Sequence, residues 1–238
     1  SFRIGALVSS TDAASVFSVL RSRRLNLKYH TASLLEVESG SNDPCAYMLT
    51  TILLGIMAGQ STSASSIVYS VFAQIIYGAL LGMAAAAVTG FVIARVKFTT
   101  EGFDTVFVFA MVLLAYAAPS VLGGNGYLSV YIFGIMLGNK NLSNKRSLVN
   151  FFDGVTGLMQ MLLFFLLGLL SFPSVLPQVM LPGLFIALFL TFVARPLAVA
   201  LILTPFGCPI RQQLFVSVAG LRGAASIVFA IMAVTSDA

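Results

Sequence analysis

The stretch LLEVESGSNDP, Leu34–Pro44, decides the fold class, because it sets carboxylates within a largely apolar run over residues 33–58. Apolar residues make up 58% of the 238-residue chain and charged residues 9%. Soluble globular domains carry about 25% charged residues. So few charges cannot cover a water-facing surface, so most of the surface must face lipid. The sequence therefore predicts an all-α protein that crosses a lipid bilayer several times.

Eight stretches have the character of membrane spans, for which about 20 mainly apolar residues are needed. They are residues 2–20, 33–58, 66–95, 103–121, 126–139, 148–171, 180–204 and 212–235. The stretch 126–139 is short, and we expect it to be a partial span. No soluble domain or long linker fits between the spans, so residues 1–238 are interpreted as part of one transmembrane domain.

The basic residues lie in alternate connections between these spans. With eight spans, loops 21–32, 96–102, 140–147 and 205–211 lie on one side of the membrane. These loops and their flanks hold ten of the thirteen Lys and Arg residues, and the loops on the other side hold none. The positive-inside rule therefore places loop 21–32 in the cytoplasm. The net charge of +5 follows from this topology, and we expect no nucleic-acid partner.

Asp43 is the main candidate for an ion site, since an ionisable residue at membrane depth is costly and indicates function. It lies about ten residues into its span, and Ser39 is four residues earlier on the same helix face. Burial disfavours the charged carboxylate, so Asp43 should hold a proton until a Na⁺ or K⁺ ion compensates the charge. Thr11, Ser39 and Asn42 offer further oxygen ligands. Competition between a proton and a cation for one site is the chemistry of an exchanger.

Asn42 determines the stoichiometry that we expect. An Asn beside Asp43 leaves one titrating carboxylate at this position, whereas two adjacent Asp residues would provide two. One carboxylate that trades one proton for one monovalent cation moves no net charge. The sequence therefore predicts electroneutral 1:1 exchange.

Glu38 has a different orientation, rotated by roughly 140° from Asp43 on a regular helix. It should face a neighbouring helix and pair with a cation, because a buried unpaired Glu is expensive. Arg195 and Arg222 are the two candidates within the spans. Glu36 is interpreted either as part of the ion path or as a solvated residue at its cytoplasmic mouth.

Two spans carry polar or glycine-rich interruptions near their centres, at Ser9–Asp12 and at Gly220–Gly223. Such interruptions suit discontinuous helices, which mark the binding sites of inverted-repeat transporters. Asp12 would compensate the positive N-terminal ends of the half-helices, and Arg222 the negative C-terminal ends. The alternative for Thr11 and Asp12 is a helix cap at a kink with no ion contact.

Several motifs together resemble the NhaP-like branch of the monovalent cation:proton antiporters, in particular its cell-volume-regulation group (CvrA) of potassium/proton antiporters. They are SSTDAASVFSVLRSRRLNLK (9–28), LEVESGSNDP (35–44), GYLSVYIFGIMLGN (126–139), NFFDG (150–154), ARPLAV (194–199) and SVAGLRGAASI (217–227). The resemblance covers nearly the whole chain.

The resemblance implies an NhaA/NhaP-like inverted-repeat fold with two discontinuous crossing helices, a core domain and a dimerisation domain. It implies that Asp43 binds the cation and the proton, with Asn42, Ser39, Thr11 and Asp12 around the site. It also implies that Glu38 pairs with Arg195 rather than Arg222. Ala13 departs from the family pattern, in which Pro is frequent after Thr-Asp. Helices of the full fold before residue 1 and after residue 238 are missing, so we treat the chain as a fragment.

The sequence therefore predicts a secondary transporter that exchanges H⁺ for K⁺ or Na⁺, with no cofactor, in a bacterial cell membrane and as a homodimer when intact. A cation channel is the alternative from another class, and a fragment without activity of its own is a further one. An enzyme is not expected, because the chain has no His-x-x-x-His pair, metal-ligand cluster or nucleophile–base pair.

Overall fold

The computed structural model describes residues 5, 9–11, 27–57, 63–96, 100, 102–142, 144–170, 174, 176–220 and 223–236. Within these residues every regular element is helical, which confirms the predicted all-α class. The predicted span 2–20 lies almost entirely outside the described residues, and so do Asp12 and Arg222.

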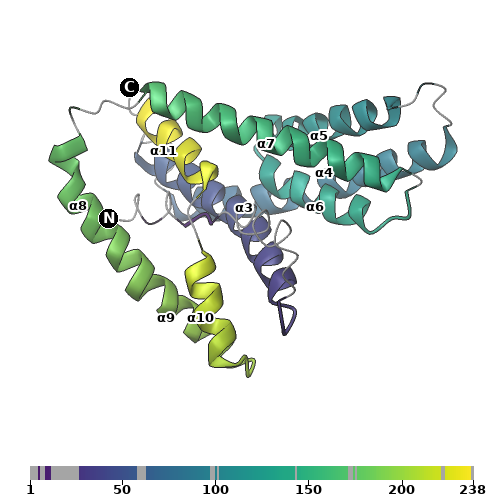
Figure 1. Ribbon diagram of the computed structural model, residues 1–238. Helices are drawn as coiled ribbons and strands as arrows, with labels where there is room; N and C mark the ends of the chain where they lie inside the picture. Colours follow the sequence, from purple (N-terminus) through teal and green to yellow (C-terminus); the bar gives the residue numbers. More distant parts are fainter. Residues whose placement is uncertain are drawn as a thin grey trace.

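The described helices follow one another along the chain with short connections (Figure 1). They are α3 (Thr31–Met57), α4 (Ala64–Arg95), α5 (Phe103–Val121), α6 (Gly126–Gly138), α7 (Lys145–Leu170), α8 (Leu176–Phe189), the π-helical turn η1 (Leu190–Ala194), α9 (Arg195–Leu203), α10 (Ile210–Ala219) and α11 (Ala224–Ser236).

Four of the described helical stretches are long and apolar enough to cross a membrane. They are α4, α5, Lys145–Leu169 and Pro177–Leu203. The last stretch combines α8, η1 and α9 into one span, with the wider π turn directly before Arg195. α6 has 13 residues and is one of two shorter apolar helices in the described part of the chain. Many large apolar side chains lie exposed on the surface of the fold, as expected for a protein surrounded by lipid.

Small residues at every fourth position of α4 allow α6 to approach its backbone closely. The stripe comprises Gly78, Gly82, Ala86 and Gly90, all of them buried. A side chain at Gly82 would collide with the backbone of Ser129 in α6. Small residues at this spacing are typical of helix pairs in membranes. A core cluster then packs beside this crossing, formed by Ala86, Val108, Ala115, Phe133, Leu137 and Leu148.

Asn125 anchors the start of α6 to two other helices, and its residue is only 2% exposed. Its side-chain oxygen accepts the Leu128 N–H at 3.1 Å and so caps α6. Its amide group donates to the Pro44 carbonyl of α3 at 2.8 Å. Its backbone N–H donates to the Gln74 carbonyl of α4 at 3.2 Å. One buried side chain therefore ties the α4–α6 bundle to the residue that follows Asp43.

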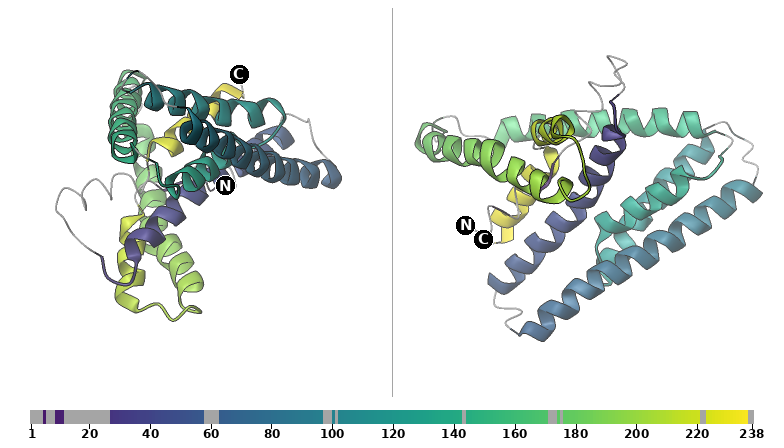
Figure 2. Two further views of the ribbon diagram at one scale, coloured as in Figure 1. Left: turned by 90° about the vertical axis from the view of Figure 1, so that its right-hand side faces the viewer. Right: turned by 90° about the horizontal axis from the view of Figure 1, so that it is seen from below.

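A second group of helices lies on the other side of α3. Figure 2 (right) shows α3 between the α4–α6 bundle and the group formed by α8, α9 and α10. Leu35 of α3 packs in an apolar cluster with Val199, Leu203 and Val216. α7 runs along the molecule from the α5–α6 end towards α11 (Figure 1). Because α3 lies between these groups, its polar residues can contact several neighbouring helices.

The predicted span 212–235 is two helices in the structure. α10 ends at Ala219, Gly220 follows it as the C-cap residue, and α11 begins at Ala224. The interruption falls where the sequence places Gly220 and Gly223. Residues 9–11, at the other expected interruption, are also non-helical.

Candidate ion-binding site

Asp43 lies near the middle of the 27-residue helix α3 and is partly buried. The Ser10 hydroxyl donates a hydrogen bond to Oδ1 of Asp43. Ser10 is itself 1% exposed, and its carbonyl accepts a hydrogen bond from the Ser226 hydroxyl of α11 at 3.2 Å. The non-helical segment 9–11 is therefore held between α3 and α11, and it presents a hydroxyl to the carboxylate.

Pro44 follows Asp43 inside the helix and has no N–H to donate to the Gly40 carbonyl. This gap in the helical ladder lies on the first turn before the carboxylate. Backbone oxygens freed within a span need another partner, which side chains, water or an ion can provide. The proline therefore adds a backbone oxygen to the polar surroundings of Asp43.

Thr11 is held by three residues of α3. The amide group of Asn42 donates to the Thr11 hydroxyl, and that hydroxyl donates to Oε1 of Glu38 at 3.2 Å. The Ser39 hydroxyl donates to the Thr11 carbonyl at 2.7 Å. Thr11, Asn42, Ser39 and Asp43 thus meet in one place, although both the hydroxyl and the carbonyl of Thr11 already serve protein hydrogen bonds.

Asn42 retains one oxygen with no assigned partner. Among the residues that the structure describes, its Oδ1 is a buried atom without a hydrogen bond. A buried carbonyl oxygen without a partner is unfavourable unless water or an ion satisfies it. Hard monovalent and divalent cations prefer such oxygen ligands. The atom precedes Asp43 by one residue and fits a cation as a ligand.

Glu38 and Arg195 form a two-pronged ion pair between α3 and α9. Nη1 of Arg195 lies 2.7 Å from Oε1, and Nη2 lies 2.9 Å from Oε2. The Arg195 side chain is 13% exposed and the Glu38 side chain 30% exposed. The planar guanidinium matches both carboxylate oxygens at once, which a Lys could not do. This geometry gives Glu38 a structural partner separate from Asp43.

Arg195 also serves the end of α10. Its Nη2 donates to the Val216 carbonyl at 3.3 Å, in the last turn of that helix. A side chain at Gly220 would collide with the guanidinium, so the glycine makes room for it. A cation is favourable at a helix C-terminus. Arg195 therefore places positive charge at the C-terminal end of α10. The compensating role predicted for Arg222 concerns a residue outside the described part and stays a prediction.

A cavity of about 410 Å³ adjoins Asp43. Its polar lining consists of Ser10, Thr11, Ser39, Asp43, Thr156 and Gln160. From α3 it includes residues at and before Asp43, towards the start of the helix. The volume accommodates on the order of ten water molecules. Asp43 therefore lies on the wall of a cavity large enough for a hydrated ion.

Aromatic side chains pack in the opposite direction along α3. Tyr47, one turn after Asp43, contacts Tyr127 of α6 with ring centroids 5.0 Å apart. Tyr127 also contacts Tyr116 of α5 and Phe229 of α11, at 5.5 and 5.7 Å. Four elements thus meet in one aromatic cluster directly beyond the carboxylate.

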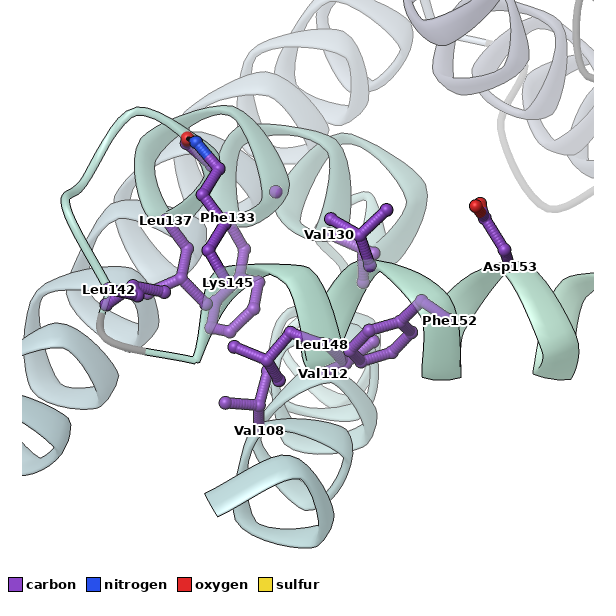
Figure 3. Close-up of a pocket in the computed structure, with 13 residues that line it drawn as sticks. Val108, Val112, Val130, Phe133, Leu137, Leu142, Lys145, Leu148, Phe152 and Asp153 are labelled. Carbon is purple, nitrogen blue, oxygen red and sulfur yellow. Dashed lines mark hydrogen bonds between the residues drawn. The ribbon is translucent and has the colours of Figure 1, made fainter. Parts of the chain in front are cut away.

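A second cavity, of about 360 Å³, lies between α5, α6 and α7 (Figure 3). Its lining is almost entirely apolar, with Lys145 and Asp153 at its two ends (Figure 3). It contains none of the residues expected to bind the ion. The polar cavity beside Asp43 is therefore the candidate site.

Sequence reasoning missed three polar residues of this cavity. Ser10 was quoted only as part of an interruption, and its contact with Asp43 depends on how segment 9–11 packs. Thr156 and Gln160 belong to the span 148–171, in which no ion ligand was predicted. The signal for Gln160 was present, because it is the one polar residue between Leu158 and Leu170.

The apolar helices that can cross a membrane, the interrupted helix and the buried polar centre are the features of a multi-pass membrane protein. The family model described as "Sodium/hydrogen exchanger, transmembrane" matches residues 1–238. The chain belongs to this sodium/hydrogen exchanger family.

Individual relatives agree with this assignment. The chain is 41% identical over 228 residues to a K(+)/H(+) antiporter NhaP of Alkalimonas amylolytica, covering 96% of this chain and 40% of the relative. It is 42% identical over 231 residues to a K(+)/H(+) antiporter NhaP2 of Shewanella oneidensis, with the same coverage. It is 31% identical over 244 residues to Na(+)/H(+) antiporter 1 of Methanocaldococcus jannaschii, covering 98% and 55%. The chain thus spans about 40% of the length of the first two relatives.

Proposed function

We propose that the intact protein is a secondary transporter that exchanges a monovalent cation, K⁺ or Na⁺, for H⁺ across a bacterial cell membrane. The observation that carries this proposal is a carboxylate, Asp43, in the middle of a helix and on the wall of a polar cavity. The names of the relatives, two potassium and one sodium antiporter, support the same activity.

Asp43 is the group for which the proton and the cation compete. When protonated it is neutral. When a cation enters, the proton leaves, and the carboxylate neutralises the cation in its place. Each exchange leaves the site with the same net charge, so one proton moves for one cation without net charge transfer.

The remaining ligands come from the immediate surroundings of Asp43. Ser10 and Ser39 line the cavity that adjoins Asp43. Asn42, the residue before Asp43, offers its buried side-chain oxygen. Thr11 lines the cavity as well, and its hydroxyl donates to Glu38 and accepts from Asn42, which leaves one lone pair of its oxygen for the ion. Asp12 is proposed as a further member of the site on the basis of the family resemblance.

Glu38 is paired with Arg195 through two hydrogen bonds and takes no part in the exchange. With Glu38 paired and an Asn at position 42, α3 contributes one titrating carboxylate to the site. This supports electroneutral 1:1 exchange, whereas two titrating carboxylates would support electrogenic transport. No resident cofactor and no enzymatic reaction is part of the proposal.

The cavity lies on the N-terminal half of α3, which the loop charges place towards the cytoplasm. The aromatic cluster around Tyr47 and Tyr127 lies in the opposite direction. This arrangement suits a conformation in which Asp43 exchanges ions with the cytoplasm. The exposed apolar surfaces of α4 and α5 suit contact with lipid or with the second subunit of a homodimer.

The test is transport by the intact protein in vesicles that contain a pH-sensitive dye. We expect addition of K⁺ or Na⁺ to dissipate an imposed proton gradient in the parent. We also expect no sustained current on a supported membrane, because exchange moves no net charge. Cation flux that persists without proton movement would identify a channel instead, and a current that reverses with voltage would contradict electroneutrality.

A further inference from the structure

The apolar cavity between α5, α6 and α7 takes no part in the proposed exchange. Four of the side chains that line its volume of about 360 Å³ are almost fully buried: Val108, Phe133, Leu137 and Leu148. Gly134 and Gly138 of α6 also line it, and both are exposed. A side chain at either glycine would meet no atom within 4 Å. The cavity is therefore an open groove, the α5–α7 groove, with room for a further apolar group against α6.

The α5–α7 groove lies in the cytoplasmic half of the membrane. It is lined by the N-terminal halves of α5 and α7, which both begin at loops that the positive-inside rule places in the cytoplasm. Lys145 and Asp153 stand at its opposite ends (Figure 3). They are eight residues apart on α7, which corresponds to about 12 Å along the helix axis. This length fits within one leaflet, since the hydrocarbon core of both leaflets together is about 30 Å thick. The groove therefore runs from the cytoplasmic surface into the depth of the inner-leaflet acyl chains.

Basic side chains gather at the cytoplasmic end of the groove. Three basic residues and no acidic one lie between the end of α6 and the first turn of α7: Lys140, Lys145 and Arg146. In the described part of the chain, none of the three is in an ion pair with a carboxylate. The Lys145 ammonium donates to the Gly138 carbonyl, which holds its charge at the edge of the groove. Asp104, at the start of α5, accepts a hydrogen bond from the Asn144 side chain at 2.9 Å. This end of the groove therefore has a net positive charge that suits an anionic group.

We propose that the α5–α7 groove binds one anionic phospholipid of the cytoplasmic leaflet. Its acyl chain lies against Gly134 and Gly138, and its phosphate lies on Lys145 and Arg146. Basic residues beside an apolar surface between membrane helices, on the cytoplasmic side, have the chemistry that recognises such headgroups. The lipid fills the space between the three helices and so holds α7 to α5 and α6. This binding is independent of the exchange at Asp43, because the groove contains no residue of that site.

The experiment measures lipid binding by the intact protein in detergent, using native mass spectrometry. Phosphatidylglycerol, which is anionic, is compared with zwitterionic phosphatidylethanolamine of the same acyl chains. The parent should bind the first phosphatidylglycerol more tightly than the first phosphatidylethanolamine. Lys145→Gln and Arg146→Gln should each weaken phosphatidylglycerol binding about fivefold, because each removes one charge near the membrane surface. Lys145→Arg keeps the charge and should bind like the parent. Arg211→Gln is the matched control, since it removes an exposed charge from α10, outside the groove.

Gly134→Leu tests the acyl-chain half of the groove. The new side chain enters open space, so the fold should be retained while phosphatidylglycerol binding falls at least fivefold. Gly183→Leu in α8 makes the same change where a side chain also meets no atom within 4 Å, and it should bind lipid like the parent. Added phosphatidylglycerol should raise the thermal unfolding midpoint of the parent and of Gly183→Leu, but not that of Gly134→Leu.

Three results would overturn the proposal. The first is a parent that binds both lipids equally, and the second is an Arg211→Gln loss as large as that of Lys145→Gln. The third is unchanged phosphatidylglycerol binding in Gly134→Leu, which would show that another helix or the second subunit covers the groove. Each result concerns lipid binding alone, so the proposed exchange would stand or fall separately.

Discussion

Removal of the Arg195 guanidinium should destabilise the protein through Glu38. Arg195→Met takes away two charge-assisted hydrogen bonds to Glu38 and one bond to the Val216 carbonyl at the end of α10. Loss of one partner of a buried ion pair costs about 3–5 kcal/mol. Glu38 is 30% exposed, so water can solvate it in part, and the expected loss lies at the lower end, about 3 kcal/mol.

The assay is thermal unfolding of the intact protein in detergent. The readout is the fraction of protein that elutes as a monodisperse peak on size-exclusion chromatography after heating to each temperature. Arg195→Met should lower the midpoint by several degrees. Arg195→Lys keeps the charge and loses the planar fork, so a smaller loss is expected. Combining Arg195→Met with Glu38→Gln removes the uncompensated charge and should restore about 2 kcal/mol relative to Arg195→Met alone. The reasoning would be refuted if Arg195→Met were as stable as the parent. It would also be refuted if the two substitutions had strictly additive effects in the double variant.

Three further substitutions probe the packing and the site. Gly82→Val places a side chain against the Ser129 backbone and should destabilise the protein by about 1–3 kcal/mol. The loss is measured as a lower unfolding midpoint. An unchanged midpoint would argue against the close α4–α6 crossing. Asn125→Ala leaves the Leu128 N–H uncapped and should cost about 1–3 kcal/mol in the same assay, while an exposed Asn139→Ala serves as the control. Ser10→Ala removes the hydroxyl that donates to Asp43 and should raise the half-saturating cation concentration roughly fivefold, equivalent to about 1 kcal/mol. Unaltered cation affinity in Ser10→Ala would show that this hydroxyl is not part of the site.

The helices were predictable because their signals are local. Long apolar runs separated by Gly and Pro give α4 and α5 within a few residues of the expected bounds. The interruption of the last span followed from Gly220 and Gly223, since glycines at mid-membrane rarely continue a helix. The π turn before Arg195 has no recognisable local signal in the sequence.

The polar centre was predictable only in part. Asp43, Ser39 and Asn42 share one helix, so their proximity follows from helical spacing alone. The partner of Glu38 remained open between two arginines on physical grounds, and the family resemblance indicated Arg195. The contacts of Ser10 and Gln160 join segments distant in sequence, and no local pattern encodes which faces meet. The use of Arg195 at the C-terminus of α10 likewise depends on tertiary packing.

Exchange by Asp43→Asn tests the central claim most directly. The intact protein is placed in vesicles with an imposed proton gradient, and dye dequenching is recorded as K⁺ and then Na⁺ are added. Glu36→Gln is the matched control, because it neutralises an exposed carboxylate of the same helix. The account predicts dequenching in the parent and in Glu36→Gln, and none in a folded Asp43→Asn. Exchange retained by Asp43→Asn would contradict a shared proton and cation site at Asp43.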